Sequence, residues 1–588
     1  FISAADGAEV IRRSAEPHIY ADVADLGTVT AHDGWIDAHI QAILDLDLVD
    51  RDAIAAAGFK VAVDAVHSTG GIAVPALLKA LGVEEVIELY CEPHGRFPHN
   101  PEPRPEHLTA LSAAVATPEM TRAAAALNAV AELKADWALA TRDVAADAPR
   151  HALRLIHGRA PAGLEGVLYR NGPGRFRRPG GSATHWFDGD GLMRAFRIQD
   201  GQATLEARFA DTPKRRTETE LDAVVTPGFG TRGDARARVG SNDDANAANT
   251  GVMPAGDRIW ALWEGGSPLA MDAADLSTQA FVTLRSDLKG MPFQAHPRRG
   301  PDGSIWNVGA AGDRAVIWRL NPDGGLNQAE VLRLPRASYM HDFTATDRHL
   351  ILVMQPWLFE TQATPIINGL VWRPEAGTQV MVLDKDDLSR RRIYELPGFF
   401  HFHLGDAWAE ADGTIRFDVA AAEDPRFAVD GARVLVEGQG TVPGDPATLA
   451  LITLRPDGRA EMTRSNAVGE FPQSDPRRRG LKRRLTVHTG GETRGRPLPT
   501  GLALQDWETG RSEGFTFGRH QVVEEVLFAP KPGATAERDA WLIGPSINLD
   551  AGRTELHVFD AARIEDGPVV SWAADFALPA GFHGAWVG

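Results

Sequence analysis

The chain has 588 residues, enough for two or three domains with sizeable hydrophobic cores. Its 79 acidic residues outnumber 61 basic ones, for a formal net charge of −18, which argues against a protein that binds nucleic acid. The single cysteine, Cys91, excludes an internal disulfide, and the absence of any apolar run of about 18 residues excludes a transmembrane helix. We therefore expect a cytoplasmic protein.

Residues 35–90 follow an α/β pattern. Apolar side chains at helical spacing predict one helix around Ile36–Leu44 and a second around Val74–Leu81. The runs "FKVAVDAV" and "EEVIELYC" are strand-like. Because these elements alternate and their connections are short, the sequence predicts one βαβ unit.

The stretch that follows, residues 105–134, is rich in alanine and shows no core pattern. We interpret residues 113–134 as a helical linker between an α/β unit at 1–112 and a second domain at 135–588. The chain opens with "FISAADGAEV", which has neither an initiator Met nor the basic segment and apolar core of a signal peptide. We expect the N-terminus to be truncated.

From residue 135 onward, hairpin signals dominate the sequence. Short β-branched and aromatic runs are separated by Asp-Gly pairs, which are typical of tight β-turns. These pairs begin at Asp200, Asp302, Asp323, Asp412 and Asp457. About 450 residues of hairpins without helical periods favour radially repeated antiparallel sheets, a β-propeller, over a single sandwich. The fold class is therefore mainly β, although no fixed-length repeat is visible.

Four of the 19 histidines stand out from their context: His296, His341, His403 and His583. Each lies beside aromatic or apolar residues near the end of a predicted strand. One such histidine by itself is more often a hydrogen-bonded core or surface residue than a metal ligand. In "FHFHL", His401 lies two residues before His403 and projects to the same face if that strand is regular.

A series of motifs runs through residues 135–588 in a fixed order. They are "LYRNGPGRF", "HWFDGDGLMRAF", "LWEGGSPLAMD", "AHP", "MHDF", "FHLGDAWAE", "GEFPQSDP" and the terminal "GFHGAWVG". In this order they resemble the carotenoid cleavage oxygenase family, which includes apocarotenoid oxygenases, stilbene-cleaving oxygenases and the retinoid isomerohydrolase. The resemblance implies a seven-bladed β-propeller with a dome of loops and helices over one end.

The same resemblance implies one Fe(II) on the propeller axis, bound by four histidines. Carried over motif by motif, its ligands are His296, His341, His403 and His583. The alternative third ligand is His401. Asp406 and Ala409 stand where the family often has Asn and Glu. This departure leaves open the alternative that the iron site has been lost. Four neutral imidazoles suit Fe(II) and leave two coordination positions for dioxygen and a water.

Family members orient the histidines with three glutamates. The matching residues are Glu264, Glu470 and Glu525, each with an exposed strand position as the plainer alternative. The third match is less specific than the others because Glu524 adjoins it and Val526 replaces the family's usual proline. Carboxylates at these places would also offset the charge of a dication bound only by neutral groups.

The activity that this resemblance implies is that of a non-haem Fe(II) dioxygenase. It would cleave a C=C bond of a carotenoid or apocarotenoid to carbonyl products, with O2 and an apolar conjugated small molecule as partners. The alternatives are a stilbene- or phenylpropanoid-cleaving dioxygenase with the same iron centre, and a non-catalytic propeller. The resemblance also implies an apolar entrance in peripheral contact with a membrane, for which Gln355–Trp372 is the candidate and buried strands are the alternative.

Residues 1–112 resemble a different family. The runs "FKVAVDAVHSTGGIAVPALLKALGV" and "CEPHGRFPHNPEPRPEHL" are similar to the second domain of bacterial phosphohexomutases of the phosphoglucosamine/phosphomannomutase type, with His67 where those enzymes usually have Asn. Such a mutase needs a phosphoserine, a Mg²⁺ held by aspartates, and sugar-phosphate loops, and the sequence shows none of them. A phosphohexomutase is therefore a third, disfavoured alternative for the function of the chain. We expect an inactive fragment, joined to the oxygenase by fusion, recombination or an assembly artefact.

Two glycine-containing motifs have a plainer interpretation as turns. "RNGP" and "FDGDG" are typical of bends in which Gly permits positive φ and Asp caps the turn. "FDGDGLM" superficially resembles the mutase metal loop, but that loop continues with Asp-Arg and this one does not. We therefore expect a structural role here.

Overall fold

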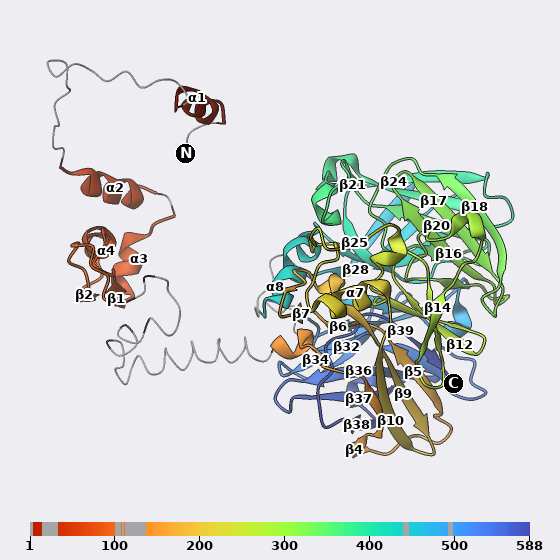
Figure 1. The fold of residues 1–588 in the computed structure, drawn as a ribbon. Helices are drawn as coiled ribbons and strands as arrows, with labels where there is room; N and C mark the ends of the chain where they lie inside the picture. Colours follow the sequence, from red (N-terminus) through yellow and green to blue (C-terminus); the bar gives the residue numbers. More distant parts are fainter. Residues whose placement is uncertain are drawn as a thin grey trace. The chain divides into compact units, whose positions relative to one another are not determined.

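The computed structural model describes residues 4–14, 33–46, 48–99, 137–438, 446–491 and 498–588, together with four single positions between 101 and 114. The chain divides into two compact units, Phe1–Ala129 and Val130–Gly588, shown in Figure 1. The predicted linker at 113–134 lies, except for one position, outside the described residues. The predicted domain boundaries therefore stay predictions.

The small unit contains a two-stranded parallel sheet. Its elements are α1 (Ala4–Ser14), α2 (Trp35–Leu44), α3 (Arg51–Ala56), β1 (Lys60–Asp64), α4 (Gly70–Ala80) and β2 (Glu85–Leu89). Lys60 of β1 lies opposite Glu85 of β2, and the connecting helix α4 contacts both strands. This arrangement confirms the predicted βαβ unit. So small a sheet leaves apolar side chains uncovered: Trp35 is 70% exposed and Leu48 is 96% exposed.

The large unit is built from seven antiparallel sheets of four to six strands (Figure 1). The first contains β3 (Ala148–Ala152), β10 (Gln202–Phe209), β9 (Asp190–Gln199), β5 (Gly166–Arg170), β39 (Gly584–Val587) and β6 (Pro173–Arg175). The second contains β11 (Gly251–Ala255), β12 (Arg258–Leu262), β13 (Leu269–Asp272) and β14 (Thr278–Phe281). The third contains β15 (Arg298–Arg299), β16 (Ile305–Ala311), β17 (Arg314–Leu320) and β18 (Leu326–Arg333).

The remaining four sheets follow in chain order. The fourth contains β19 (Thr344–Ala345), β20 (His349–Met354), β23 (Thr378–Asp384) and β24 (Arg391–Leu396). The fifth contains β25 (Phe400–Leu404), β26 (Trp408–Ala409), β27 (Ile415–Ala422), β28 (Thr448–Leu454) and β29 (Ala460–Val468). The sixth contains β30 (Glu470–Gln473), β31 (Leu485–Gly490), β32 (Gly501–Asp506) and β33 (Ser512–Thr516). The seventh contains β34 (Gln521–Val523), β35 (Leu527–Pro530), β36 (Ala540–Asn548), β37 (Arg553–Asp560), β38 (Val570–Ala573) and β4 (Arg154–Gly158).

These sheets form a seven-bladed propeller, which confirms the predicted fold class. Edge strands of neighbouring blades contact one another, as β11 does with β39, β25 with β30, and β35 with β39. The ring is closed twice, because β4 pairs with β38 in the seventh blade and β39 pairs with β5 in the first. Hydrophobic clusters fill the spaces between blades, so central strands such as β20 are buried on both faces. Ring closure removes the open sheet edges that would otherwise invite further pairing.

The Asp-Gly pairs form hairpin turns, as predicted. Each of their glycines adopts a positive φ, from 73° at Gly201 to 97° at Gly458. At the turn between β9 and β10, Asp200 also has a positive φ, of 51°. Two successive residues in this region match the twist of the flanking strands, which is why Asp-Gly is favoured there.

The glycines of "RNGP" and "FDGDG" have a different role from the one predicted. Gly172, Gly189 and Gly191 do not have positive φ. Instead, a Cβ at Gly172 would lie 2.5 Å from Gly581, and one at Gly191 would lie 2.3 Å from the Ala248 carbonyl oxygen. Close backbone approach at Gly172 and Gly191, and the packed side chains of Pro173 and Phe176 at Gly189, therefore require glycine here, and turn geometry does not.

The aspartates of "FDGDG" are structural, as expected. Asp188 accepts hydrogen bonds from the backbone N–H groups of residues 229–231, and Asp190 forms ion pairs with Arg178 and Lys214. Donors from the protein contact all four carboxylate oxygens of the two residues, so this motif is a buried crosslink between loops.

Short helices and long connections lie between the strands. They include α7 (Pro213–Leu221), α8 (Ala432–Val436), a π-helical turn (Phe427–Gly431), the two-stranded sheets β7 (Arg177–Arg178) with β8 (Gly181–Ser182) and β21 (Trp357–Phe359) with β22 (Leu370–Trp372), and 3-10 turns at Ala138–Thr141, Trp186–Asp188, Asn242–Asp244, Ser286–Leu288, Ile366–Gly369, Pro374–Ala376, Pro476–Arg478 and Ile564–Asp566. Among the helices described, none has both the length and the apolar composition of a membrane-spanning segment.

Candidate metal centre

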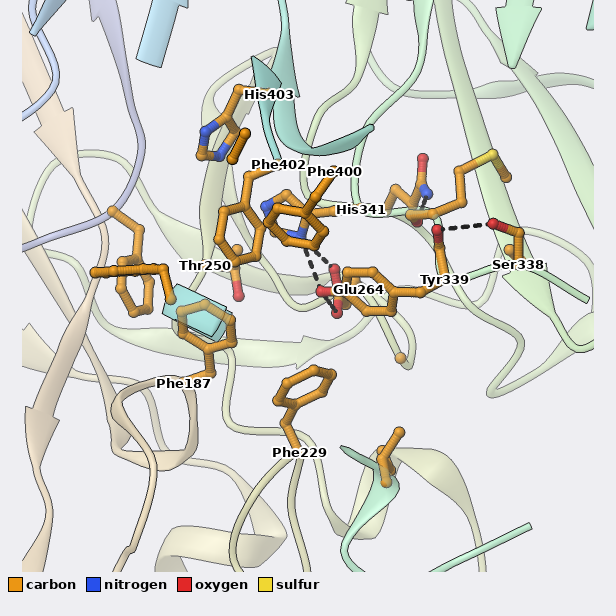
Figure 2. A pocket seen from close by; sticks show the side chains of 18 of the residues that line it. Phe187, Phe229, Thr250, Glu264, Ser338, Tyr339, His341, Phe400, Phe402 and His403 are labelled. Carbon is orange, nitrogen blue, oxygen red and sulfur yellow. Dashed lines mark hydrogen bonds and ion pairs between the residues drawn. The ribbon is translucent and has the colours of Figure 1, made fainter. Parts of the chain in front are cut away.

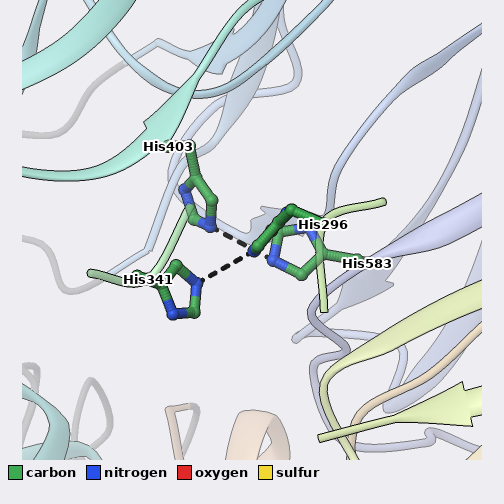
Figure 3. A group of neighbouring side chains, drawn as sticks. All are labelled: His296, His341, His403 and His583. Carbon is green, nitrogen blue, oxygen red and sulfur yellow. Dashed lines mark hydrogen bonds between the residues drawn. The ribbon is translucent and has the colours of Figure 1, made fainter. Parts of the chain in front are cut away.

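Four histidines from four different blades meet in one place (Figure 3). His296 lies just before β15, His341 before β19, His403 within β25 and His583 before β39. One ring nitrogen from each lies within 4.8 Å of the others, and three of the four residues are buried. Since each blade supplies its histidine at the same edge of its sheet, the wide spacing in the sequence is a consequence of the propeller.

The inward-facing atoms of this cluster are the Nε2 atoms. His296 Nε2 lies 3.1 Å from His341 Nε2, and His403 Nε2 lies 3.1 Å from His583 Nε2. Two ligands bound side by side to one ion, each at the usual metal–imidazole distance, are about 3 Å apart. The spacing of these nitrogens therefore fits a single metal ion.

Three of the imidazoles contact a carboxylate through their outer nitrogen. Nδ1 lies 2.6 Å from Glu264 for His341, 2.6 Å from Glu470 for His403 and 2.9 Å from Glu525 for His583. A carboxylate can only accept, so each Nδ1 carries the proton and each Nε2 presents a lone pair. This arrangement orients the rings and makes them stronger donors to a cation.

The facing lone pairs of His403 and His583 need a positive charge between them. Both rings donate through Nδ1, so neither has a proton left for a hydrogen bond between their Nε2 atoms. Without a cation, two lone pairs would oppose each other in a buried space. This is the feature of the cluster that a metal explains best.

Burial keeps much of the cluster neutral. It lowers the pKa of His583 to about 3, despite the neighbouring Glu525 carboxylate. Burial and the other three histidines hold the pKa of His296 well below its usual value. Although burial opposes it, the Glu264 carboxylate raises the pKa of His341 above its usual value. Neutral imidazole, the form that binds metals, is thus favoured at His296 and His583.

The glutamates are themselves held in place. Glu264 also accepts from the Tyr339 hydroxyl at 3.0 Å, and the backbone N–H of Phe471 donates to Glu470 at 2.8 Å. Phe471 has a φ of 56° and stacks on the ring of His403, with ring centroids 4.8 Å apart. Burial and the Glu264 charge hold the pKa of Tyr339 well above its usual value, so it remains a hydrogen-bond donor.

Glu524 and Glu525 are adjacent in the sequence but have different partners. Glu525 contacts His583 and accepts from Arg170 Nη1 at 2.7 Å. Glu524 forms ion pairs with Arg170 and Arg194, each at 3.1 Å. The structure therefore places Glu525, and not its neighbour, beside the histidine.

His401 does not join the cluster. Its sharing a face with His403 depends on a regular strand, and a register shift between His401 and Leu404 makes β25 irregular. His401 is fully buried near Phe399, and burial lowers its pKa to about 3. It is a core residue.

The other departures from the family pattern are accommodated locally. Asp406 pairs with Arg298 at 3.1 Å and accepts from Ser474, so it ties together the loops beneath the histidines. Ala409 lies in β26 opposite Ile415. Neither residue belongs to the group of four nitrogens.

Sequence reasoning missed several residues that support the cluster. Tyr339, Phe471 and Arg170 were not singled out, although all three lie in or beside the quoted motifs "MHDF", "GEFP" and "LYRNGP". Tyr339 lies two residues before His341, a spacing that puts both on one face of an extended chain. The Arg170 contact spans more than 350 residues, so no local signal could have revealed it.

An aromatic cavity of about 790 Å³ ends at the histidines (Figure 2). Its lining includes His341, His403 and His583, and its mainly apolar walls contain a group of aromatic side chains: Trp186, Phe187, Phe229, Phe400, Phe402, Phe427, Phe471 and Phe582. Phe359, within the predicted membrane patch, also lines this cavity, and Trp357 and Leu370 are only 2% and 9% exposed. Much of that segment therefore faces the interior, although Ile366 is 38% exposed.

The fold and the four-histidine cluster together define a propeller protein with a candidate metal centre on its axis. The profile of the retinal pigment epithelial membrane protein family matches residues 141–588, and the chain belongs to this family. Residues 37–141 match domain II of phosphoglucomutase/phosphomannomutase, an alpha/beta/alpha domain. Both resemblances stated from the sequence are thereby confirmed.

Individual relatives cover almost the same part of the chain. The apocarotenoid-15,15'-oxygenase of Synechocystis sp. is 28% identical over 73% of this chain and 92% of its own length. Resveratrol cleavage oxygenase 1 of Aspergillus fumigatus is 26% identical over 74% of this chain and 91% of its own length. The crystal structure of cobalt-substituted Synechocystis ACO has a TM-score of 0.70 at 25% identity, and covers 77% of this chain and 98% of that one.

Proposed function

We propose that the chain is a non-haem Fe(II) dioxygenase that cleaves a C=C bond of a carotenoid or apocarotenoid to two carbonyl products. The observation that carries this proposal is the set of four converging imidazoles, three with a carboxylate behind them, at the inner end of an aromatic cavity. Membership of an oxygenase-containing family and the names of the two relatives support the same reaction class.

The residues present fit an iron ion. His296, His341, His403 and His583 would hold it, with Glu264, Glu470 and Glu525 orienting three of the ligands. Imidazole suits Fe(II), among other transition metals, and the three carboxylates offset the charge of a dication. Iron bound there would supply the chemistry that lets dioxygen react with an olefin, and two coordination positions would remain open.

The aromatic walls of the cavity would bind and orient the substrate. Phe187, Phe402 and Phe582 pack edge to face beside the histidines, with ring centroids 5.6–5.7 Å apart. Flat apolar surfaces of this kind fit a conjugated polyene, exclude water from the reacting double bond and contribute no competing nucleophile. In the balanced reaction, one olefin and one O2 give two carbonyl groups with one new oxygen atom in each.

The lining leaves the stilbene alternative open. A phenol needs a polar group to hold its hydroxyl, and Thr250, Glu360 and Gln362 are among the polar residues that line the cavity. The relative named for resveratrol makes this alternative worth testing beside the polyene.

The experiment is a product analysis under ¹⁸O2. The purified chain is loaded with Fe(II) under anaerobic conditions and mixed with an apocarotenal or a stilbene, with the metal-free chain as matched control. We expect the apocarotenal to yield two carbonyl products that each carry one ¹⁸O. Cleavage of the stilbene alone would select the alternative, and no turnover of either compound would contradict the reaction.

We further propose that the mutase-like unit is inactive as a mutase. The support is that its described part holds one parallel strand pair and its sequence shows no phosphoserine loop or magnesium loop. Interconversion of glucosamine phosphate isomers by the purified chain would contradict this. Cytoplasmic location and peripheral membrane contact stay predictions.

A further inference from the structure

A second cavity, of about 850 Å³, borders the histidine cluster. Its lining includes His296, His403 and His583, whereas the aromatic cavity reaches His341, His403 and His583. The cluster therefore forms part of the wall between two cavities. The second one differs in chemistry, because its lining contains the basic residues Arg298, Arg299, Arg477, Arg479 and Lys531.

Three of these cations have carboxylate partners. Arg298 pairs with Asp342 at 2.8 Å and with Asp406, while Arg477 pairs with Asp475 and Lys531 with Asp560. Of the two aspartates that line the cavity, Asp342 also accepts from the backbone N–H groups of Phe343 and Leu404, and Asp406 also accepts from Ser474. The lining Glu525 is likewise committed to His583 and Arg170.

Arg299 and Arg479 are left without a carboxylate. Arg299 donates only to the backbone carbonyls of Pro254 and Pro322. Arg479 forms no hydrogen bond and no ion pair with any residue in the described part of the chain, although it is half-buried. Glu165 also lines the cavity, but it is exposed and no ion pair joins it to either arginine.

Both guanidinium groups line the same cavity, and neither has a carboxylate within ion-pair distance among the described residues. Burial and the charge of Arg479 both lower the pKa of Arg299. Burial also lowers the pKa of Arg479 despite the attraction of Asp406 and Asp475, and Arg298 adds to the repulsion. An anion would stabilise two such partly desolvated cations that lack a direct ion pair.

Arg479 is held on a fixed loop. The side chain of Asp475 caps the 3-10 turn Pro476–Arg478 through the Arg477 backbone N–H at 2.9 Å. On the other side, Gly480 has a φ of 71°, and its carbonyl accepts from the Asp347 backbone N–H at 2.9 Å. A side chain presented by such a loop loses little backbone freedom when it binds a ligand.

We propose that Arg299 and Arg479 form a binding site for a small anion, an inorganic oxyanion or a carboxylate, in the second cavity. Guanidinium groups recognise both through paired N–H donors. The site is separate from the aromatic cavity and does not depend on a bound metal or on the proposed cleavage reaction.

The test is a titration of the full-length chain with sulfate and, separately, acetate at constant ionic strength. We expect saturable binding of at least one of them in both the metal-free and the Fe(II)-loaded chain. Arg479→Gln should weaken that binding at least tenfold, whereas Arg478→Gln, the adjacent arginine that does not line the cavity, should leave it unchanged. Binding of sulfate identifies an oxyanion site, and binding of acetate alone identifies a carboxylate site.

Two further measurements keep the result unambiguous. Circular dichroism checks that each variant folds, and Arg479→Lys, which keeps the charge but loses the paired donors, should bind with intermediate affinity. A crystal soaked in selenate should show selenium between the two arginines. Saturation by neither anion, equal affinity in Arg479→Gln, or binding that requires the metal would each overturn the proposal.

Discussion

The two units of this chain differ in how completely their sheets are closed. In the propeller, β4 pairs with β38 and β39 pairs with β5. Strands from both ends of the large unit therefore pair within blades of the ring. The described part of the small unit has one parallel strand pair, and Trp35, Leu48 and Phe59 are more than half exposed. A closed ring can hold a complete site on its axis, whereas an isolated strand pair offers neither a full core nor a full set of catalytic loops.

Arg170 takes part in both ring closure and the metal centre. This residue lies at the end of β5, where the last strand of the chain pairs with the first blade, and its guanidinium contacts Glu524, Glu525 and the Phe582 carbonyl. The next residue, Asn171, accepts from the Phe582 N–H at 2.8 Å and donates to the His583 carbonyl at 2.9 Å. The strand that completes the ring thus also positions a histidine of the cluster.

The largest effect on stability is expected from Arg170→Gln. It would leave two buried glutamates without their shared cation, which costs about 3–5 kcal/mol for a broken buried ion pair. Thermal unfolding measures this cost, and metal retention tests the positioning of His583 beyond stability. Arg170→Lys should recover part of both. Arg197→Gln, which loses carbonyl contacts and a cation–π contact with Tyr169 but no ion pair, is the matched control. An equal loss there would argue against a special role for closure.

Glu470→Gln should have the next largest effect. The amide can still accept from His403, but it carries no charge to strengthen the ligand or balance the dication. Loss of such a partner typically lowers metal affinity by 10- to 100-fold, so we expect a change of about that size. Competition with a chelator measures it. Glu461→Gln, on the outer strand β29, is the control and should leave the metal affinity unchanged. An unaltered metal affinity in Glu470→Gln would show that the Glu470 carboxylate does not contribute to metal binding.

Acid should release the metal through His341 before it affects His583. The Glu264 carboxylate raises the pKa of His341, so its protonated form persists to higher pH and competes with the metal there. His583, with a pKa of about 3, stays neutral much further into acid. Metal affinity should therefore fall as the pH falls, and half of the metal should be released well above pH 3. The measurement is the metal retained after gel filtration of samples at a series of pH values. Full retention down to that pH would show that His341 does not control release.

The smallest effect should follow removal of residues 1–129. If the propeller is complete by itself, metal content and cleavage rate should change by less than about twofold, because ring closure involves only strands of the large unit. Elemental analysis and turnover of the shortened chain measure both quantities. Loss of metal on removal would mean that the small unit contributes to the site.

The sequence predicts the propeller and the positions of its histidines better than the details around them. Asp-Gly turns carry their own backbone preference, so the hairpins can be recognised locally. His296, His341, His403 and His583 can be recognised because each sits in a distinct motif. The contacts of Glu525 and Arg170, in contrast, depend on which blades become neighbours.

Two local patterns prove insufficient. The sequence does not reveal the register shift that makes β25 irregular, on which the relation of His401 to His403 depends. The glycines of "FDGDG" are required by close neighbours from other segments, such as the Ala248 carbonyl beside Gly191 and the Phe176 ring beside Gly189. In both cases tertiary packing decides what a local pattern leaves open.

The most direct test of the metal centre is the iron content of the purified chain after anaerobic Fe(II) loading. His341→Ala removes one ligand, and His349→Ala, a half-buried histidine eight residues further along, is the control. We predict close to one iron per chain in the native protein and in the control, and little in His341→Ala. No iron in the native chain, or equal iron in all three, would contradict a four-histidine iron site.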